Sequence, residues 1–253
     1  MLNKTVWENR HTTRLFSEEN TDIPSDDLKY LETVINNIPS QCSIKSHFWI
    51  YLGQSTEDMK LRTWLADNVF WIMQQRNTIK EHMLGVIQAP AIILSIRCSD
   101  PWANTEPDKT EEDHSELATR SEGLHAGVIL ATLLNMNYNV ATFGCTSGLH
   151  SDADEKDFNE KKAEFQKMIR DRYANELEEL VSKFPGEAGN WDDIEFFPSI
   201  STCFGPEAID KQEVVGDTFD KWTSPSGKDY RFYNGVKTRT PAASCVGFRR
   251  NYE

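Results

Sequence analysis

Two short clusters of basic residues lie near opposite ends of the 253-residue chain. Residues 10–14 read Arg-His-Thr-Thr-Arg, and residues 237–241 read Lys-Thr-Arg-Thr-Pro. Arg binds phosphate oxygens with a planar pair of donors, Lys adds a point charge, and Thr hydroxyls supply further donors. The clusters therefore indicate a phosphate-binding site. Both can contact one phosphate only if the fold brings the two ends of the chain together.

The rest of the chain is acidic, with 40 Asp and Glu residues against 27 Lys and Arg residues and a formal net charge of −13. This charge argues against a general nucleic-acid-binding protein, because the phosphate backbone would be repelled. The 38% hydrophobic share and seven Trp residues are typical of a packed globular protein. We expect no leader peptide and no membrane-spanning segment, because no apolar run is long enough. The five scattered cysteines form no Cys-x-x-Cys pair, so we expect neither a disulfide framework nor a thiolate metal site. We therefore expect a cytoplasmic location.

Hydrophobic periodicity predicts alternating helices and strands between the two clusters. Helices are predicted over residues 21–38, 57–84, 116–137 and 152–184, and strands over 48–52, 91–96, 140–143 and 200–204. The 116–137 helix is apolar over more than one face, which predicts a central position or a subunit contact.

The remaining segments are predicted to be connections. Residues 100–115 are polar and acidic, so we expect a surface loop there, and the tail from residue 207 onward is predicted to be irregular. Together the elements predict a mixed α/β, or α+β, fold in one domain over residues 1–253. An extended helical and acidic segment at about 150–198 is part of that domain.

Two further motifs lie at the ends of predicted elements. Residues 39–43, Pro-Ser-Gln-Cys-Ser, follow the first helix and by themselves indicate only a helix stop. Residues 144–148, Gly-Cys-Thr-Ser-Gly, follow the third strand and offer backbone amides, but they lack the spacing and the Lys of a P-loop. His82, His114, His125 and His150 lack metal-ligand spacing and are interpreted as structural or solvated.

The order of these features resembles the nitroreductase family of FMN-dependent oxidoreductases. An opening motif R-[RH]-[ST]-x-[RK]-x-[FY] is typical of that family, and residues 10–16 match it at every defined position. A Pro-Ser loop follows the first long helix of the family, and some members end in Lys-x-Arg-x-Pro. The resemblance is densest at residues 9–16, 39–51, 122–146 and 236–241. It implies a nitroreductase-like fold, with a central, mainly antiparallel sheet flanked by helices, in a homodimer of the domain-swapped type.

The resemblance also implies an FMN site built from two chains. The FMN phosphate and ribityl chain would be bound by Arg10, His11, Thr12, Lys237 and Arg239, and the flavin pyrimidine edge by Arg14. The partner subunit would contribute Ser40, Gln41 and Ser43, and flavin N5 would face the backbone amide of Gly144, or of Cys145 if the alignment shifts by one residue. No catalytic side chain and no metal are implied, because FMN carries the hydride chemistry.

The chain departs from the family pattern inside these motifs. Ser43 stands where the family usually has Asn, Lys45 where it has Gln, and His47 where it has Trp. The flavin-pyrimidine contacts of the 57–84 region are unplaced, with Asn68 as a candidate. We expect these departures to affect substrate preference rather than FMN binding.

Two classes of function follow. The first is an enzyme that takes hydride from NADH or NADPH and reduces a nitroaromatic, a quinone or a similar small acceptor with ping-pong kinetics. Flavin cleavage and reductive dehalogenation are related outcomes on the same scaffold. The second is a non-catalytic flavin-binding or interaction protein, with the charged 152–184 helix as its partner surface. The basic clusters favour a cofactor site in either class, and we favour the enzyme.

Overall fold

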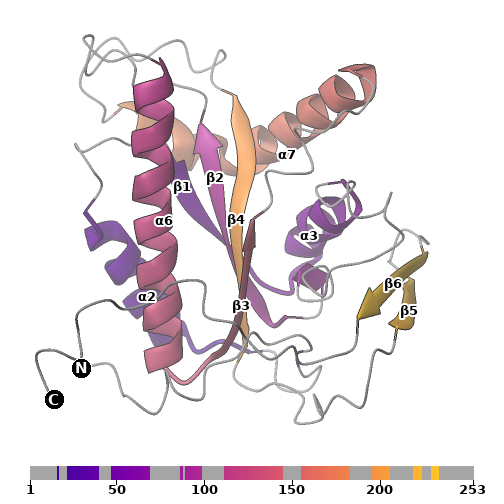
Figure 1. Cartoon of the computed structure of the whole chain (residues 1–253). Coiled ribbons are helices and arrows are strands. Elements are labelled where there is room, and N and C mark those ends of the chain that lie inside the picture. The colour runs from indigo at the N-terminus through magenta and orange to yellow at the C-terminus, as the bar shows by residue number, and fades with distance from the viewer. Residues whose placement is uncertain are drawn as a thin grey trace, which may run out of the picture.

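The computed structural model describes Phe16 and residues 22–39, 47–68, 86–87, 89–98, 111–144, 155–182, 195–205, 219–223 and 229–233. A four-stranded sheet lies at the centre of these residues (Figure 1). Its strands are β1 (His47–Leu52), β2 (Ala91–Cys98), β3 (Asn139–Gly144) and β4 (Phe196–Gly205). Their order is β1-β2-β4-β3, and every neighbouring pair is antiparallel. The expected antiparallel central sheet is therefore confirmed, with β1 and β3 as its edge strands.

Helices cover both faces of the sheet (Figure 1). One face carries α2 (Ser25–Asn37) and α6 (Glu111–Asn135), and the other carries α3 (Thr56–Asn68) and α7 (Glu155–Ser182). Each predicted helix thus overlaps a helix of the structure, and the α+β class is confirmed. None of the helices within the described ranges has both the length and the apolar character needed to cross a membrane.

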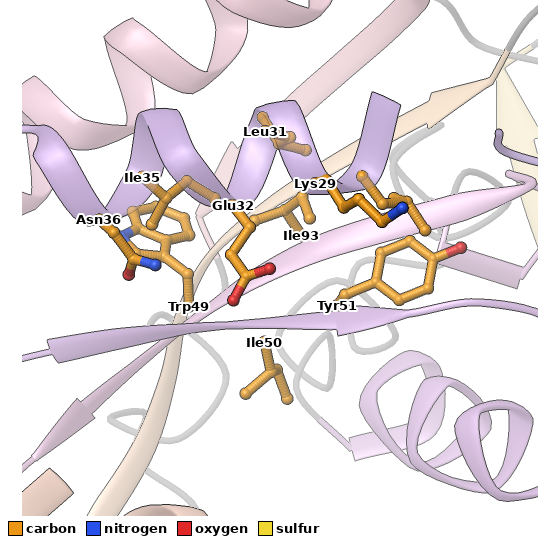
Figure 2. Close-up of a pocket in the computed structure, with 10 residues that line it drawn as sticks. Lys29, Leu31, Glu32, Ile35, Asn36, Trp49, Ile50, Tyr51 and Ile93 are labelled. Carbon is orange, nitrogen blue, oxygen red and sulfur yellow. The ribbon is translucent and has the colours of Figure 1, made fainter. Parts of the chain in front are cut away.

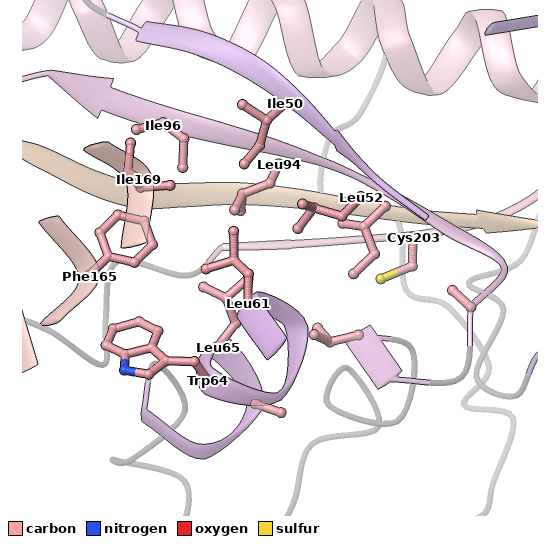
Figure 3. Packing of buried hydrophobic residues seen from close by; sticks show 14 of the residues in the cluster. Ile50, Leu52, Leu61, Trp64, Leu65, Leu94, Ile96, Phe165, Ile169 and Cys203 are labelled. Carbon is pink, nitrogen blue, oxygen red and sulfur yellow. The ribbon is translucent and has the colours of Figure 1, made fainter. Parts of the chain in front are cut away.

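The period-2 alternation of β2 supplies a core to each face. Ile92, Leu94 and Ile96 point toward α3 and α7, where Figure 3 shows Leu61 and Trp64 of α3 packing near Phe165 of α7. Ala91 and Ile93 belong to the opposite core, under α2 and α6. Because both faces of β2 are buried, the strand reads as a nearly continuous apolar run.

The long helix α6 begins earlier than predicted. It starts at Glu111, so residues 111–115 are helical and the prediction of a loop through residue 115 was wrong. The acidic residues Glu111, Glu112 and Asp113 favour a helix here, because they lie at the positive end of the helix dipole. The helix ends with Asn137 in the left-handed region, at φ 65°, and with the backbone N–H of Tyr138 bonded to the carbonyl of Leu133 at 3.0 Å. This Schellman-type end directs the chain into β3.

Three other expectations change in detail. The acidic helix α7 is kinked at Tyr173, whose φ of −119° and ψ of 18° are not helical. The tail is not wholly irregular, because β5 (Phe219–Thr223) and β6 (Asp229–Tyr233) pair as an antiparallel two-stranded sheet. The predicted buried strand at 48–52 is an edge strand with Tyr51 38% exposed. The single-domain assignment stays a prediction.

Candidate functional site

Gly144 is the FMN-contact candidate that lies within the described part of the chain. It is the last residue of β3 and is paired in register with Ile200 of β4. The other candidates lie outside the described residues: Arg10, His11, Thr12, Arg14, Ser40, Gln41, Ser43, Cys145, Lys237 and Arg239. Their assignments stay predictions, and the structure bears on them through the described residues that flank them.

Phe16, the last residue of the opening basic motif, is fully buried in the core between the sheet and α3. It lies beside Gly205, the last residue of β4, because a Cβ added at Gly205 would be 3.3 Å from Phe16 Cδ1 and 2.6 Å from Pro90 Cδ. The anchor of the N-terminal basic cluster and the start of the C-terminal tail are therefore adjacent. Convergence of the two basic clusters themselves stays a prediction, because residues 10–14 and 237–241 lie outside the described part of the chain.

The loop assigned to the partner's flavin leaves α2 and enters β1, at one edge of the sheet. Pro39 and His47 bound this segment, whereas Gly144 ends β3 at the opposite edge. Three inter-strand steps separate β1 from β3, which corresponds to about 14 Å. Pro39 and Gly144 therefore lie toward opposite edges of the sheet, and the two-chain site stays a prediction.

A group of polar side chains, here called the polar layer, lies between α6 and the sheet. It consists of His47 and Trp49 of β1, Ser95 and Arg97 of β2, Ser199 of β4, and Glu122 and His125 of α6. The sheet register pairs His47 with Arg97 and Trp49 with Ser95, so four of these residues are direct neighbours on one face. Side chains far apart in sequence therefore meet beneath one turn of α6.

Glu122 is the centre of the polar layer and is only 1% exposed. One carboxylate oxygen accepts a hydrogen bond from Ser95 Oγ, and the other accepts from Ser199 Oγ at 3.0 Å and from Arg97 Nε at 2.7 Å. Arg97 also donates to Thr119 Oγ1 at 2.8 Å. A buried carboxylate needs such partners, because its desolvation is otherwise costly. Glu122 therefore fastens α6 to β2 and β4.

His47, Trp49 and His125 form the second part of the polar layer. His47 Nε2 lies 3.0 Å from His125 Nδ1, and Trp49 Nε1 donates to the same nitrogen at 3.4 Å. Burial lowers the pKa of His47 to about 4, because the Glu122 carboxylate raises it less than burial lowers it and His125 and Arg97 lower it further. Burial also lowers the pKa of His125, against the opposing effects of the Pro39 backbone carbonyl and of Glu122. Both rings are therefore neutral at pH 7.

A cavity of about 380 Å³ lies between α2 and β1 (Figure 2). Trp49 and Tyr51 line its β1 side, while Ile35 and the polar residues Lys29 and Glu32 come from α2. Lys29 Nζ is 3.3 Å from Asp26, so the cation is partly neutralised, and the Glu32 carboxylate would repel an anion. The size suits a small molecule, but the charges do not suit a phosphate.

Sequence reasoning missed the polar layer. Its signal was present in β2, where Ser95 and Arg97 follow an otherwise apolar run, because a polar side chain in a buried strand needs a partner. Asn68, the candidate for a pyrimidine contact, donates its side-chain amide to the Trp64 carbonyl at 3.0 Å. Within the described ranges, no group of three or more His, Cys, Asp or Glu residues could hold a metal ion.

Comparisons with known proteins identify the architecture. No protein-family model matches the chain. No curated protein matches it either. Among solved structures, nitroreductase A from Vibrio parahaemolyticus is similar at a TM-score of 0.50 and 11% identity, over 84% of this chain and 70% of that one. The NADPH:FMN oxidoreductase from Vibrio harveyi, complexed with NAD⁺, is similar at a TM-score of 0.50 and 10% identity, over 84% and 71%. The family resemblance seen in the sequence is thus confirmed at the level of the backbone, and the chain has the nitroreductase fold.

Proposed function

We propose that the protein is an FMN-dependent oxidoreductase that takes hydride from NADH or NADPH and reduces a nitroaromatic, a quinone or a similar small acceptor. The observation that carries the proposal is the fold shared with an NADPH:FMN oxidoreductase, on a chain whose opening residues 10–16 match the family's cofactor motif. The buried side chain of Phe16 supports it, because that contact fixes the end of the motif beside the start of the C-terminal tail.

The residues proposed to hold FMN have suitable chemistry. Arg10, Lys237 and Arg239 would neutralise the phosphate, and the hydroxyl of Thr12 would donate to it. Arg14 would place a fixed cation at the pyrimidine edge, where reduced flavin carries negative charge. When bound, FMN would supply the hydride-accepting and hydride-donating chemistry, and the protein would supply position and electrostatics.

Flavin binding is the first test. Purified protein reconstituted with FMN should be yellow and should release FMN on denaturation. Arg10→Ala should weaken binding by about 1.5–3 kcal/mol, because a hydrogen bond to a charged group is lost. Lys29→Ala is the matched control, since Lys29 is an exposed cation outside the proposed site, and it should leave the affinity unchanged. Absence of bound flavin after reconstitution would refute the proposed function.

We also propose a homodimer, on the basis of the outward face of α6. Leu124 on this helix is 49% exposed, and Gly123 and Gly127 are exposed with no atom within 4 Å of an added Cβ. Two glycines four residues apart next to an exposed Leu form a smooth, partly apolar strip that permits close approach of another helix. The opposite-edge positions of Pro39 and Gly144 support the same conclusion.

The dimer can be tested by sedimentation at micromolar concentration. Gly127→Arg should yield a monomer, because the long cation would block the close approach of a second chain. Ala163→Arg on α7 is the matched control, since it makes a similar change at an exposed position on the other face of the sheet. A wild-type protein that is monomeric when loaded with FMN would contradict the dimer.

Catalysis is tested separately from binding. If donor and acceptor use one pocket in turn, double-reciprocal plots at several acceptor concentrations should give parallel lines. Intersecting lines would indicate a ternary complex instead. Tight FMN binding without any oxidation of NADH or NADPH would contradict the enzyme and identify a non-catalytic flavin-binding protein.

A further inference from the structure

The cavity between α2 and β1 has an aromatic wall on its β1 side. Trp49 and Tyr51 are two residues apart on the strand, so both side chains lie on the face of the sheet that carries α2. Trp49 Nε1 donates to His125 Nδ1 at 3.4 Å, which turns the polar edge of the indole toward α6. The hydroxyl of Tyr51 lies beside Gly53, 3.2 Å from a Cβ built there. The cavity therefore receives mainly the carbon surfaces of the two rings.

The rest of the lining is largely apolar. Ile35 of α2 lies opposite the strand, and Ile93 of β2, the register partner of Tyr51, forms the floor (Figure 2). The side chain of Ile93 is only 3% exposed, so the floor is closed by the core. The volume of about 380 Å³ lies at the small end of the range for ligand sites. The cavity thus suits a compact molecule with an apolar body, such as one ring with a short chain.

Glu32 sets the charge preference of this cavity. Its carboxylate lies between the two aromatic rings (Figure 2), and among the described residues it takes part in no ion pair and no hydrogen bond. The ammonium group of Lys29 lies at the Tyr51 end and is shared with Asp26 at 3.3 Å. Helix α2 carries the carboxylates of Asp26, Asp27 and Glu32 against this one cation. A positively charged group beside Glu32 would therefore be attracted, and an anion would be repelled.

The charges around Tyr51 act in the same direction. Burial raises the pKa of Tyr51, and the carboxylates of Asp58 and Asp22 raise it further, against the opposing effect of the Arg62 guanidinium. The ring is therefore uncharged at pH 7 and lies in a negative potential. The face of a neutral aromatic ring attracts a cation, and Trp is the most effective ring for this contact. The aromatic wall and the Glu32 carboxylate thus favour the same kind of ligand.

We propose that the cavity between α2 and β1 binds a small organic cation, with an ammonium group beside the Glu32 carboxylate and an apolar body against Trp49 and Tyr51. This site goes beyond the proposed flavin chemistry and does not depend on it. The residues that form it belong to α2, β1 and β2, and none of them is among the residues proposed to hold FMN.

The probe is phenethylammonium, which has one ring on a short chain and, like a Lys side chain, is protonated at pH 7. Its matched anion is phenylpropionate, which carries a carboxylate on a similar chain. Nitrogen-15 NMR of the full-length protein reports binding through the indole N–H signal of Trp49, which the spectrum of Trp49→Phe identifies. At constant ionic strength, phenethylammonium should shift this signal along a saturating single-site curve. Phenylpropionate should give no saturation over the same concentrations.

Two variants locate the charge that selects the ligand. Glu32→Gln should weaken binding of phenethylammonium about three- to fivefold, the effect expected for an exposed ion pair. Glu57→Gln is the matched control, because it makes the same change of charge on α3, which covers the other face of the sheet. The Glu57 carboxylate is 66% exposed and lies 2.6 Å from Lys60 Nζ. Glu57→Gln should leave the affinity unchanged.

Three results would contradict the organic-cation site. Absence of a saturating shift at Trp49 would show that the cavity takes no such ligand. Equal affinities for phenethylammonium and phenylpropionate, or an unchanged affinity in Glu32→Gln, would show that the carboxylate does not select the ligand. Equal weakening in Glu32→Gln and Glu57→Gln would show that the net charge of the protein, and not this cavity, attracts the cation.

Discussion

The guanidinium of Arg62 is fully buried, and its loss should be among the most damaging single changes in this protein. The residue is 0% exposed and donates to the backbone carbonyls of Val86 at 2.6 Å, Gly53 at 2.7 Å and Ile87 at 3.1 Å. It also donates to the carbonyl of Ala89. Burial lowers its pKa to about 10, which still leaves the side chain charged at pH 7. One cation thus fixes the chain that enters β2 to the end of β1.

Replacement by Met removes the Arg62 donor from all four carbonyls, and the Ala89 carbonyl keeps a second donor, Gln54 Nε2 at 2.8 Å. Removing one member of a buried charged network costs about 3–5 kcal/mol, partly offset here because the charge itself is no longer buried. We therefore expect Arg62→Met to lower the free energy of unfolding by about 3 kcal/mol or more, a large part of the 5–15 kcal/mol typical of a domain.

Lys60→Met is the matched control two residues away on α3. Lys60 Nζ lies 2.6 Å from Glu57, but both side chains are about two-thirds exposed, at 65% and 66%. Such surface pairs contribute about 0.2–1 kcal/mol. Urea unfolding should show a large fall in the midpoint for Arg62→Met and a small one for Lys60→Met, with similar slopes. Equal midpoints for the two variants would refute the reasoning.

Two further predictions follow from the described residues. Because the pKa of His47 falls from 6.5 to about 4 on folding, the unfolded state binds more protons between these values. As far as His47 determines it, the free energy of unfolding should have its full value above pH 6.5 and fall by at most about 3 kcal/mol toward pH 4. In His47→Gln, urea midpoints should depend less steeply on pH, and an unchanged slope would contradict the assignment. Gly205→Ala should destabilise by about 1–3 kcal/mol, because its Cβ would be 2.6 Å from Pro90 Cδ. A Gly205→Ala variant with the melting temperature of the wild type would show that Pro90 can move at little energetic cost.

The type of a secondary-structure element was predictable where its pattern of apolar residues was long and regular. The apolar run that includes Ile92 and Leu94 indicated a strand buried on both faces, and the periodic apolar positions of α7 indicated a helix buried on one face. The start of α6 was missed because acidic residues were interpreted as a solvated loop, although acidic residues also stabilise the first turn of a helix. The β5–β6 pair was missed because each strand is only five residues long and β5 has no regular alternation of polar and apolar residues.

The polar layer could not be derived from sequence, for a different reason. His47, Ser95, Glu122 and Ser199 are brought together only by the strand order and the register, and neither is encoded in any local pattern. Ser95 alone signalled that a buried strand needed a polar partner, but it did not identify Glu122. The family resemblance gave no help, because His47 is a departure from it. The basic residues proposed to bind FMN are the opposite case. Local motifs identified them in the sequence, but their positions in the fold stay a prediction.

Helix α6 places its sheet-facing and outward-facing residues close together in the sequence. Glu122 and His125 face the sheet, whereas Gly123, Leu124 and Gly127 face outward. If flavin sites require two chains, loss of the dimer must also weaken FMN, so Gly127→Arg should lose both properties together.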